Sequence, residues 1–380
     1  MPHPLPSDPI AAVAHPDPYP YYAALRGRGG LQRDDTLGLW IATSADVVDR
    51  LLREPAGRVR PPAERVPRFL LGTHAGAVFG ALARMNDGER HVAQRARVEA
   101  MLQRIDRTDP ADLARIADDL ARPWRRDGDP IALDDLIRGL PTTIIAAILG
   151  VPQDDRPAVV SATAAWVAGL SARADDAARD AAIAAMDELL DRLSALGVAD
   201  TDDAAAHVAL LMQPHEATAG WIGAGVLRLA RDAALRDAAC NGSLDAEAFG
   251  SEVLRHDPPV QNTRRTLAAD VTIADGALRA GDSVLVVLAA AERDPRRHAE
   301  PDRFRLDRPR PPSLELGAGP HRCPGGALAL RIACAAWHAL ANDTPPDAFA
   351  ALADRVRWRP SANVRAPVFG AAPRHDSIAS

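Results

Sequence analysis

The sequence contains no lysine, and all 45 of its basic residues are arginine. This absence excludes mechanisms that depend on a lysine side chain, among them the P-loop, the kinase strand lysine and a Schiff base. Three cysteines in 380 residues are too few for a disulfide-stapled scaffold. Aromatic residues make up only 4% of the chain, but 47% of it is hydrophobic, which is enough apolar material for a large buried core.

Long apolar runs are also missing. No stretch of about 18 uninterrupted apolar residues occurs, so no membrane span is predicted. Residues 1–8 are polar and proline-rich and lack the cationic and apolar regions of a signal peptide. The formal net charge of −6 argues against a general nucleic-acid binder. We therefore expect a soluble, cytoplasmic protein without nucleic-acid or membrane partners.

Helical periodicity dominates most of the chain. Apolar and charged residues recur at helical spacing with proline or glycine between the segments, and this predicts helices over 18–28, 89–104, 110–126, 133–150, 156–171, 173–197 and 203–232. A strand pair is expected over 36–43, with a turn near Gly38. After Pro258 the pattern changes to β-like segments, a proline-rich meander and a last helix, at 260–267, 271–273, 283–289, 294–320 and 323–341. We expect one mainly helical domain over residues 1–380 with a small β region.

Residues 316–326, Leu-Gly-Ala-Gly-Pro-His-Arg-Cys-Pro-Gly-Gly, form the most distinctive segment. Four glycines and two prolines around Cys323 indicate a tight loop that ends at a helix start, where free N–H groups favour a thiolate. Gly317 and Gly325 would let a flat ligand approach the backbone closely. Taken alone, the cysteine would more often be a small buried hydrophobe in an ordinary turn. We assign that role to the other two cysteines, Cys240 and Cys334.

The loop resembles the haem-binding signature of the cytochrome P450 family, Phe-Gly-x-Gly-x-His/Arg-x-Cys-x-Gly. Only the first position departs from it, because Leu316 replaces a phenylalanine that packs near the proximal sulfur. The resemblance implies the cytochrome P450 fold, a helical domain with a small β region around a buried haem b, iron protoporphyrin IX. It makes Cys323 the axial iron ligand, with Gly317 and Gly325 among the haem-binding residues.

A second group of motifs resembles the proximal side of the same family. Glu252-Val-Leu-Arg255 matches Glu-x-x-Arg on one helix face, although an isolated match would more often be a surface pair. Pro301-Asp-Arg303-Phe resembles the meander whose arginine completes this cluster. The resemblance therefore implies that Glu252, Arg255 and Arg303 form a structural brace.

A third group resembles the residues that contact the haem propionates. Asp87-Gly-Glu-Arg-His91, followed by Arg95, is similar to the helix that supplies two of these contacts. His91 and Arg95 are four residues apart, so both can face one carboxylate. Arg265 and His321 align with the other usual propionate contacts. Seen alone, each of these side chains would more often be a solvated surface charge.

The oxygen-side helix of the family carries Ala/Gly-Gly-x-Asp/Glu-Thr, and this chain departs from that pattern. Glu216 fits the acid position, Pro214 replaces the glycine, and Ala217 replaces the threonine that helps to deliver protons. Proton delivery would then pass through Glu216 and water, through Thr218, or through a hydroxyl of the substrate. Thr218 is rotated by about 100° from position 217, so it reaches the same spot only if a kink redirects it. Family members with alanine here include hydroxylases and enzymes that couple radicals.

The resemblance implies a bacterial-type haem-thiolate monooxygenase that oxidises a small organic substrate, free or carrier-bound, in secondary metabolism. No flavin or iron–sulfur module occurs, so a separate ferredoxin-type donor with its reductase is expected, docking on arginines near the proximal loop: Arg305, Arg308, Arg310, Arg322 and Arg331. Two alternatives stay open: oxidative C–C or C–N coupling without oxygen insertion, and a catalytically silent haem protein. Substrate contacts are expected partly from residues 57–86, whose arginines more often form a solvated face than an anion site.

Overall fold

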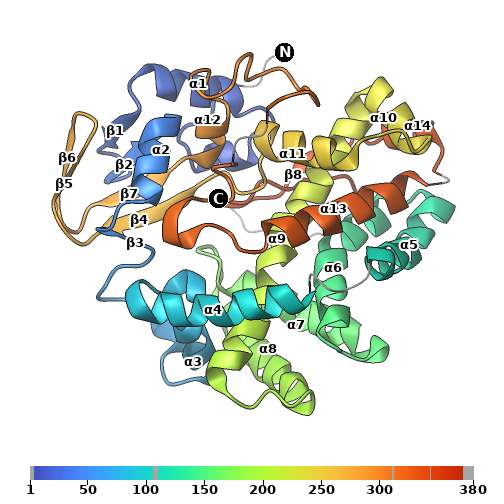
Figure 1. The fold of residues 1–380 in the computed structure, drawn as a ribbon, viewed down its shortest axis with the longest axis horizontal. Coiled ribbons are helices and arrows are strands. Elements are labelled where there is room, and N and C mark those ends of the chain that lie inside the picture. The colour runs from blue at the N-terminus through green and yellow to red at the C-terminus, as the bar shows by residue number, and fades with distance from the viewer. Residues whose placement is uncertain (1–3, 106–109, 310–311, 343, 371–380) are drawn as a thin grey trace.

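One long helix organises the computed structural model, which describes residues 4–105, 110–309, 312–342 and 344–370. This helix, α9 (Thr201–Arg231), runs through the middle of the molecule (Figure 1). Asp200 begins it by accepting hydrogen bonds from the N–H groups of Asp202 and Asp203. Helices from both halves of the chain pack against it: α3 (His74–Ala81), α4 (Gly88–Ile105), α6 (Pro130–Ile148), α7 (Arg156–Gly169), α8 (Asp176–Ala195), α11 (Ala246–His256) and α13 (Gly326–Ala341).

The remaining helices cover the flanks of this arrangement. They are α1 (Tyr19–Gly27), α2 (Ala45–Leu52), α5 (Pro110–Asp127), α10 (Ala233–Cys240), α12 (Leu288–Glu292) and α14 (Pro346–Ala350), with short 3-10 turns at Ala11–Ala14, Arg68–Leu70, Ala83–Met85 (η3), Gln153–Asp155 and Gly319–His321. The predicted helices are confirmed to within a few residues at their ends. None of the helices in the described part of the chain is long and apolar enough to cross a membrane.

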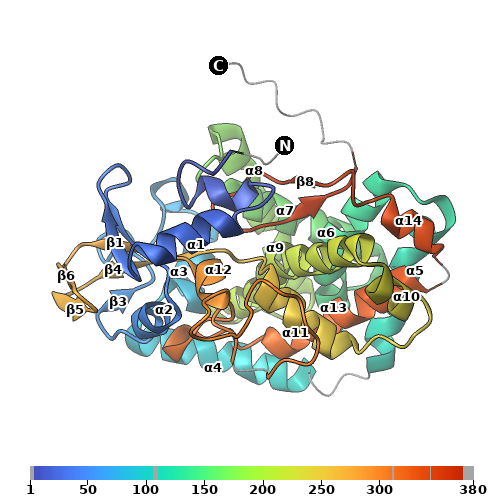
Figure 2. The ribbon, with the colours of Figure 1, turned by 90° about the horizontal axis from the view of Figure 1, so that it is seen from above.

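A five-stranded sheet lies at the opposite end of the molecule from α5, α10 and α14 (Figure 2). Its strand order is β1-β2-β7-β4-β3, and only the β2–β7 pair is parallel. The strands are β1 (Leu31–Asp34), β2 (Leu39–Ala42), β3 (Gly57–Arg58), β4 (Thr263–Leu267) and β7 (Ser283–Val286). Two further hairpins are β5 (Val271–Ile273) with β6 (Gly276–Leu278), and β8 (Arg357–Trp358) with β9 (Pro367–Val368).

The strand pair predicted over 36–43 is displaced in the structure. Its first strand lies upstream, at 31–34, because residues 35–38 form the turn and Gly38 adopts a φ of +66° there. The predicted meander is confirmed, since between α12 and the turn at Gly319 the described residues contain neither helix nor strand. The helix expected from Cys323 begins at Gly326, because the Cys323 N–H bonds back to Leu316 and belongs to the loop.

Candidate functional site

Cys323 lies in a closed loop directly before α13. Its backbone N–H donates to the Leu316 carbonyl oxygen at 2.7 Å, and this bond closes the loop. The side chain is exposed to water. Nevertheless, burial raises the pKa of the Cys323 thiol, while the Gly325 N–H lowers it. The Cys323 residue is therefore accessible although many protein atoms lie around it.

The backbone beside the thiol leaves room for a flat group. A Cβ atom placed on Gly325 meets no other atom within 4 Å. Gly317 serves the loop instead, because its φ is +75° and a Cβ there would lie 3.3 Å from the His321 carbonyl oxygen. An accessible soft sulfur ligand with open space beside it suits the axial site of an iron porphyrin. These residues therefore fit the haem that the sequence predicts.

Three of the predicted propionate contacts come together where α4 meets the loop. The rings of His91 and His321 have centroids 4.1 Å apart, and His321 Nε2 lies 3.1 Å from Asp87 Oδ1. Arg95 donates to the carbonyl oxygens of Pro320, at 3.0 Å, and Arg322, at 2.6 Å. Through Arg95, helix α4 therefore holds the Cys323 loop. Arg95 lies on the side of the loop where the sequence predicts the propionate contacts.

The fourth contact, Arg265, reaches the same region from β4. Its side chain is buried and donates to Arg264 O at 2.9 Å and, more weakly, to Thr263 Oγ1 at 3.5 Å, with no carboxylate partner among the described residues. Burial lowers its pKa, and the charge of Asp87 raises it. A buried cation without a carboxylate partner fits an anionic group supplied by a cofactor.

His91 is neutral at ordinary pH in this arrangement. Burial lowers its pKa to about 4, and the charges of His321 and Arg95 add to this effect. A neutral imidazole can donate one hydrogen bond to a carboxylate without a charge of its own. The assignment of these four residues to the propionates stays a prediction.

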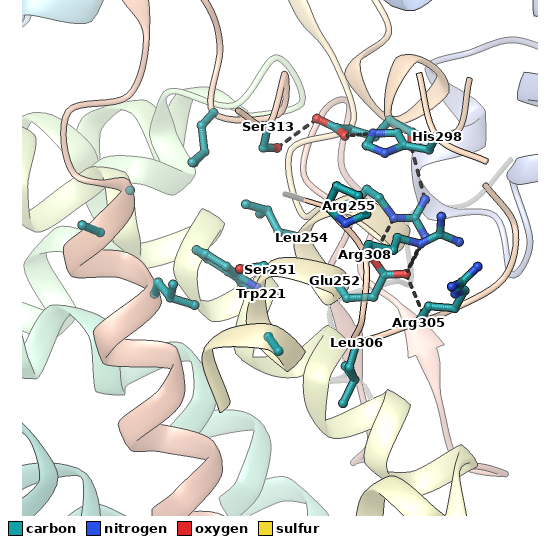
Figure 3. Close-up of a pocket in the computed structure, with 17 residues that line it drawn as sticks. Trp221, Ser251, Glu252, Leu254, Arg255, His298, Arg305, Leu306, Arg308 and Ser313 are labelled. Carbon is teal, nitrogen blue, oxygen red and sulfur yellow. Dashed lines mark hydrogen bonds and ion pairs between the residues drawn. The ribbon is translucent and has the colours of Figure 1, made fainter. Parts of the chain in front are cut away.

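A buried ion cluster braces the proximal side. Arg255 donates from Nη2 and Nε to the Glu252 carboxylate at 2.7 and 2.8 Å, and both residues are buried (Figure 3). Arg308 completes the cluster, with its Nε 3.1 Å from Glu252 Oε1. The prediction that Arg303 is the third member is wrong. Its guanidinium is 67% exposed and lies 3.5 Å from Glu300.

A cavity of about 230 Å³ lies between this cluster and the Cys323 loop (Figure 3). Trp221, Leu254, Leu306, Leu316 and Leu330 are among the apolar side chains that line it. Leu316, at the position where the resemblance expects phenylalanine, is one of these lining residues.

The central part of α9 presents an incompletely covered face. Gln213, Glu216 and Ala217 are only partly buried, whereas Thr218 is 3% exposed. Because position 218 is turned by about 100° from position 217, the structure does not bring the Thr218 hydroxyl to this face. Among the alternatives for proton delivery, the geometry favours Glu216 with water or with the substrate.

Glu216 has a partner that the sequence analysis missed. Its Oε1 lies 2.9 Å from Arg359, which follows β8, and both side chains are about 30% exposed. No motif surrounds Arg359, so only the folded hairpin reveals the contact. The preceding residue on the helix, His215, turns away, and its Nδ1 lies 3.1 Å from Thr142 Oγ1 on α6.

Two of the five arginines predicted to dock the electron donor are engaged in ion pairs. Arg308 is used inside the ion cluster, and Arg305 is paired with Glu300 and Asp307 at 2.9 and 3.0 Å. Arg310 lies outside the described residues. Arg322, beside Cys323, is exposed.

Comparison with known proteins shows which family and fold this chain resembles. A family model described as Cytochrome P450 matches residues 246–333. The chain is similar to cytochrome P450 monooxygenase PikC of Streptomyces venezuelae, with 30% identity over 384 residues, 92% of this chain and 89% of PikC. The 20-oxo-5-O-mycaminosyltylactone 23-monooxygenase of Streptomyces fradiae is 27% identical over 84% of this chain and 81% of its own length. The crystal structure of CalO2 shares the fold with a TM-score of 0.79 and 26% identity, covering 96% of this chain and 99% of CalO2.

Proposed function

This chain belongs to the cytochrome P450 family and is a haem-dependent monooxygenase, and on that premise we propose that it inserts one oxygen atom into a small organic substrate of secondary metabolism. Reducing equivalents come from a separate ferredoxin-type protein with its reductase, and a single catalytic domain over residues 1–380 acts in the cytoplasm. The accessible Cys323 thiol, held in a loop braced by α4, is the observation that supports this best.

The overall reaction balances with one dioxygen molecule, two electrons and two protons, giving hydroxylated product and water. Haem held by Cys323 would supply the redox centre for dioxygen chemistry. His91, Arg95, Arg265 and His321 would bind its carboxylates and fix its orientation. Glu252, Arg255 and Arg308 hold the segment behind the loop.

The protons enter from the α9 side. Glu216 is the only carboxylic acid of the distal motif, and its pairing with Arg359 keeps the carboxylate oriented at the edge of the partly covered face. Ala217 places no hydroxyl there, so water or a hydroxyl of the substrate must relay the proton from Glu216. Productive turnover therefore depends on how well the substrate fills this face.

The electron donor docks beside the Cys323 loop, with Arg322 as the exposed cation nearest to the thiol in sequence. An acidic ferredoxin surface complements this charge, and such pairs act mainly on the association rate. Arg322→Glu is expected to slow reduction by ferredoxin several-fold at low salt and less at high salt. Unchanged rates would remove Arg322 from the interface.

Product mass tests the proposed reaction directly. The holoenzyme is first checked for the thiolate-type spectrum of its ferrous carbon monoxide complex and then supplied with ferredoxin, reductase and isotopically labelled dioxygen. A product heavier by one labelled oxygen supports insertion. A product lighter by two hydrogens, or a coupled dimer, supports the second candidate, oxidative coupling, which the missing hydroxyl at Ala217 favours. A normal carbon monoxide spectrum without any turnover points to the catalytically silent alternative.

A further inference from the structure

Two buried glutamates that the proposed reaction does not use lie next to each other on the proximal side. Glu292 ends α12 and is 1% exposed, and Glu315 stands just before the Cys323 loop and is 8% exposed. The backbone N–H of Glu315 donates to Oε1 of Glu292 at 3.2 Å, so the two residues are in direct contact. Two acidic groups are therefore buried together beside the loop that carries the thiol.

The carboxylate of Glu292 is surrounded by hydrogen-bond donors. Its Oε1 accepts from the Ser313 hydroxyl at 2.9 Å and from the backbone N–H groups of Leu314 and Glu315. Its Oε2 lies 3.3 Å from Nε2 of His298, and Ser313 and His298 lie on either side of the carboxylate (Figure 3). Donors of this kind favour the ionised form of a carboxyl group, so Glu292 carries the negative charge of the pair.

The side chain of Glu315 lacks comparable support. Its Oε2 is buried and forms no hydrogen bond within the described part of the chain. Ionisation would place an unpartnered charge beside the charge of Glu292, and two neighbouring carboxyl groups in such surroundings do not both ionise. Burial and the charge of Glu292 raise the pKa of Glu315 to about 8, although the Val260 N–H lowers it. Glu315 is therefore the member of the pair that holds a proton at neutral pH.

The backbone joins Glu315 directly to the haem-ligand loop. The carbonyl oxygen of the next residue, Leu316, accepts the hydrogen bond from the Cys323 N–H at 2.7 Å that closes the loop. Burial raises the pKa of the Cys323 thiol, and a negative charge on Glu315 raises it further. A charge on Glu315 thus opposes negative charge at the sulfur. Reduction of the iron held by this sulfur adds one electron, and like charges repel across the interior.

We propose that Glu315 links the reduction of the haem iron to the uptake of one proton, so that the iron accepts an electron more readily while Glu315 is neutral. In the range where Glu315 titrates, the ferredoxin-type donor supplies one electron to ferric iron, and solvent supplies one proton to the Glu315 carboxylate. The titratable groups that face Glu315 are Glu292 from α12 and Cys323 from the loop, while His298 faces Glu292. This inference rests on the proposed function, because it names a regulation of the same haem-thiolate site.

The reduction potential of the substrate-free holoenzyme, measured between about pH 6 and 9.5, tests the proposal. We expect the potential to fall by about 59 mV as Glu315 ionises, which corresponds to a roughly tenfold difference in the reduction equilibrium. Glu315→Gln cannot ionise and should keep the potential near its acidic value throughout. Glu247→Gln is the matched control, because this glutamate on α11 is exposed, and it should retain the full pH dependence.

Infrared difference spectra of the ferric holoenzyme at the two pH limits give a second readout. The band of a neutral carboxyl group should disappear at high pH in the unmodified enzyme and in Glu247→Gln, and should be missing from the difference spectrum of Glu315→Gln. A potential that is independent of pH in the unmodified enzyme, or a pH dependence that survives Glu315→Gln, would overturn the proposal. If Glu315→Gln loses haem, Glu315→Ala allows the same comparison.

The potential is measured without turnover, so it does not depend on whether oxygen is inserted. Failure of oxygen insertion with an intact pH dependence would contradict the proposed function alone. Normal oxygen insertion with a potential that does not respond to pH would contradict the role of Glu315 alone.

Discussion

The carboxylate of Glu216 lies 2.9 Å from the guanidinium of Arg359, so the middle of α9 is tied to the hairpin β8–β9 near the end of the chain. The pair lies at the edge of the face that carries Ala217. Any function of Glu216 in proton delivery must therefore depend on a residue far away in sequence.

Glu216 and Arg359 are expected to act as a unit. Glu216→Gln and Arg359→Gln should each reduce the fraction of electrons recovered in product several-fold, because each leaves the other group unpaired. The double variant should be no worse than the poorer single variant, which is the mark of coupled residues. Multiplied effects in the double variant would show that the two residues act independently.

Ala217→Thr restores a hydroxyl on the partly covered face of α9. We expect fewer electrons lost to peroxide with poorly fitting substrates, and a smaller change with a substrate that supplies its own hydroxyl. Peroxide release and product yield measured together check this. Thr218→Val is the matched control, because the Thr218 side chain is buried and should affect neither quantity by more than about twofold.

Arg308 and Arg303 provide a matched pair for the proximal cluster. Arg308→Ala should lower the stability of the holoenzyme by about 3–5 kcal/mol, because it leaves the buried Glu252 carboxylate with one cation fewer. Arg303→Ala removes an exposed side chain and should change stability by no more than about 0.5 kcal/mol. The denaturant midpoint and the haem content of both variants test this prediction. An equal loss of stability in the two variants would contradict the assignment of Arg308, rather than Arg303, to the Glu252 cluster.

Leu316→Phe should fill part of the cavity of about 230 Å³ beside the Cys323 loop. We expect a gain of about 1 kcal/mol in stability, typical of cavity filling. Leu316→Ala should cost about 2–3 kcal/mol because it enlarges the cavity. Thermal unfolding compares the two variants, while the reduction potential of the Phe variant reports any change at the thiolate. A less stable Phe variant would mean that the ring does not fit the cavity.

Stability should fall with pH below about 6.5 because of His215. Burial lowers its pKa to about 4, and the charges of Arg359 and Arg138, which face it from the hairpin and α6, act in the same direction. A depressed histidine pKa contributes stability above its unfolded value near 6.5, and this contribution is lost as the pH falls toward 4. His215→Gln should therefore reduce the loss of Tm between pH 7 and 4.5, whereas His207→Gln, at a half-buried position, should not.

The sequence predicted those parts of the fold and site that depend on local pattern. The Cys323 loop is encoded by contiguous glycines and prolines, and α9 by its periodicity, so both were predictable. Arg303 and Arg308 stand five residues apart in an irregular segment where no period indicates which side chain points inward. Arg308 meets Glu252 across 56 residues, and that contact depends on tertiary packing. The contact of Arg359 with the distal acid depends on packing in the same way.

Residues 299–303 of the meander between α12 and the Cys323 loop are held by two guanidinium groups. Arg255 and Arg308 donate to backbone carbonyl oxygens of Ala299, Glu300, Pro301 and Arg303, in place of the ladders that a helix or strand would provide. The bonded atoms of the meander are main-chain oxygens, which every amino acid carries. These particular bonds therefore do not depend on which side chains residues 299–301 and 303 carry, as long as the two arginines and Glu252 stay. An irregular segment of the proximal side is thus fixed through atoms that a side-chain substitution within it does not remove.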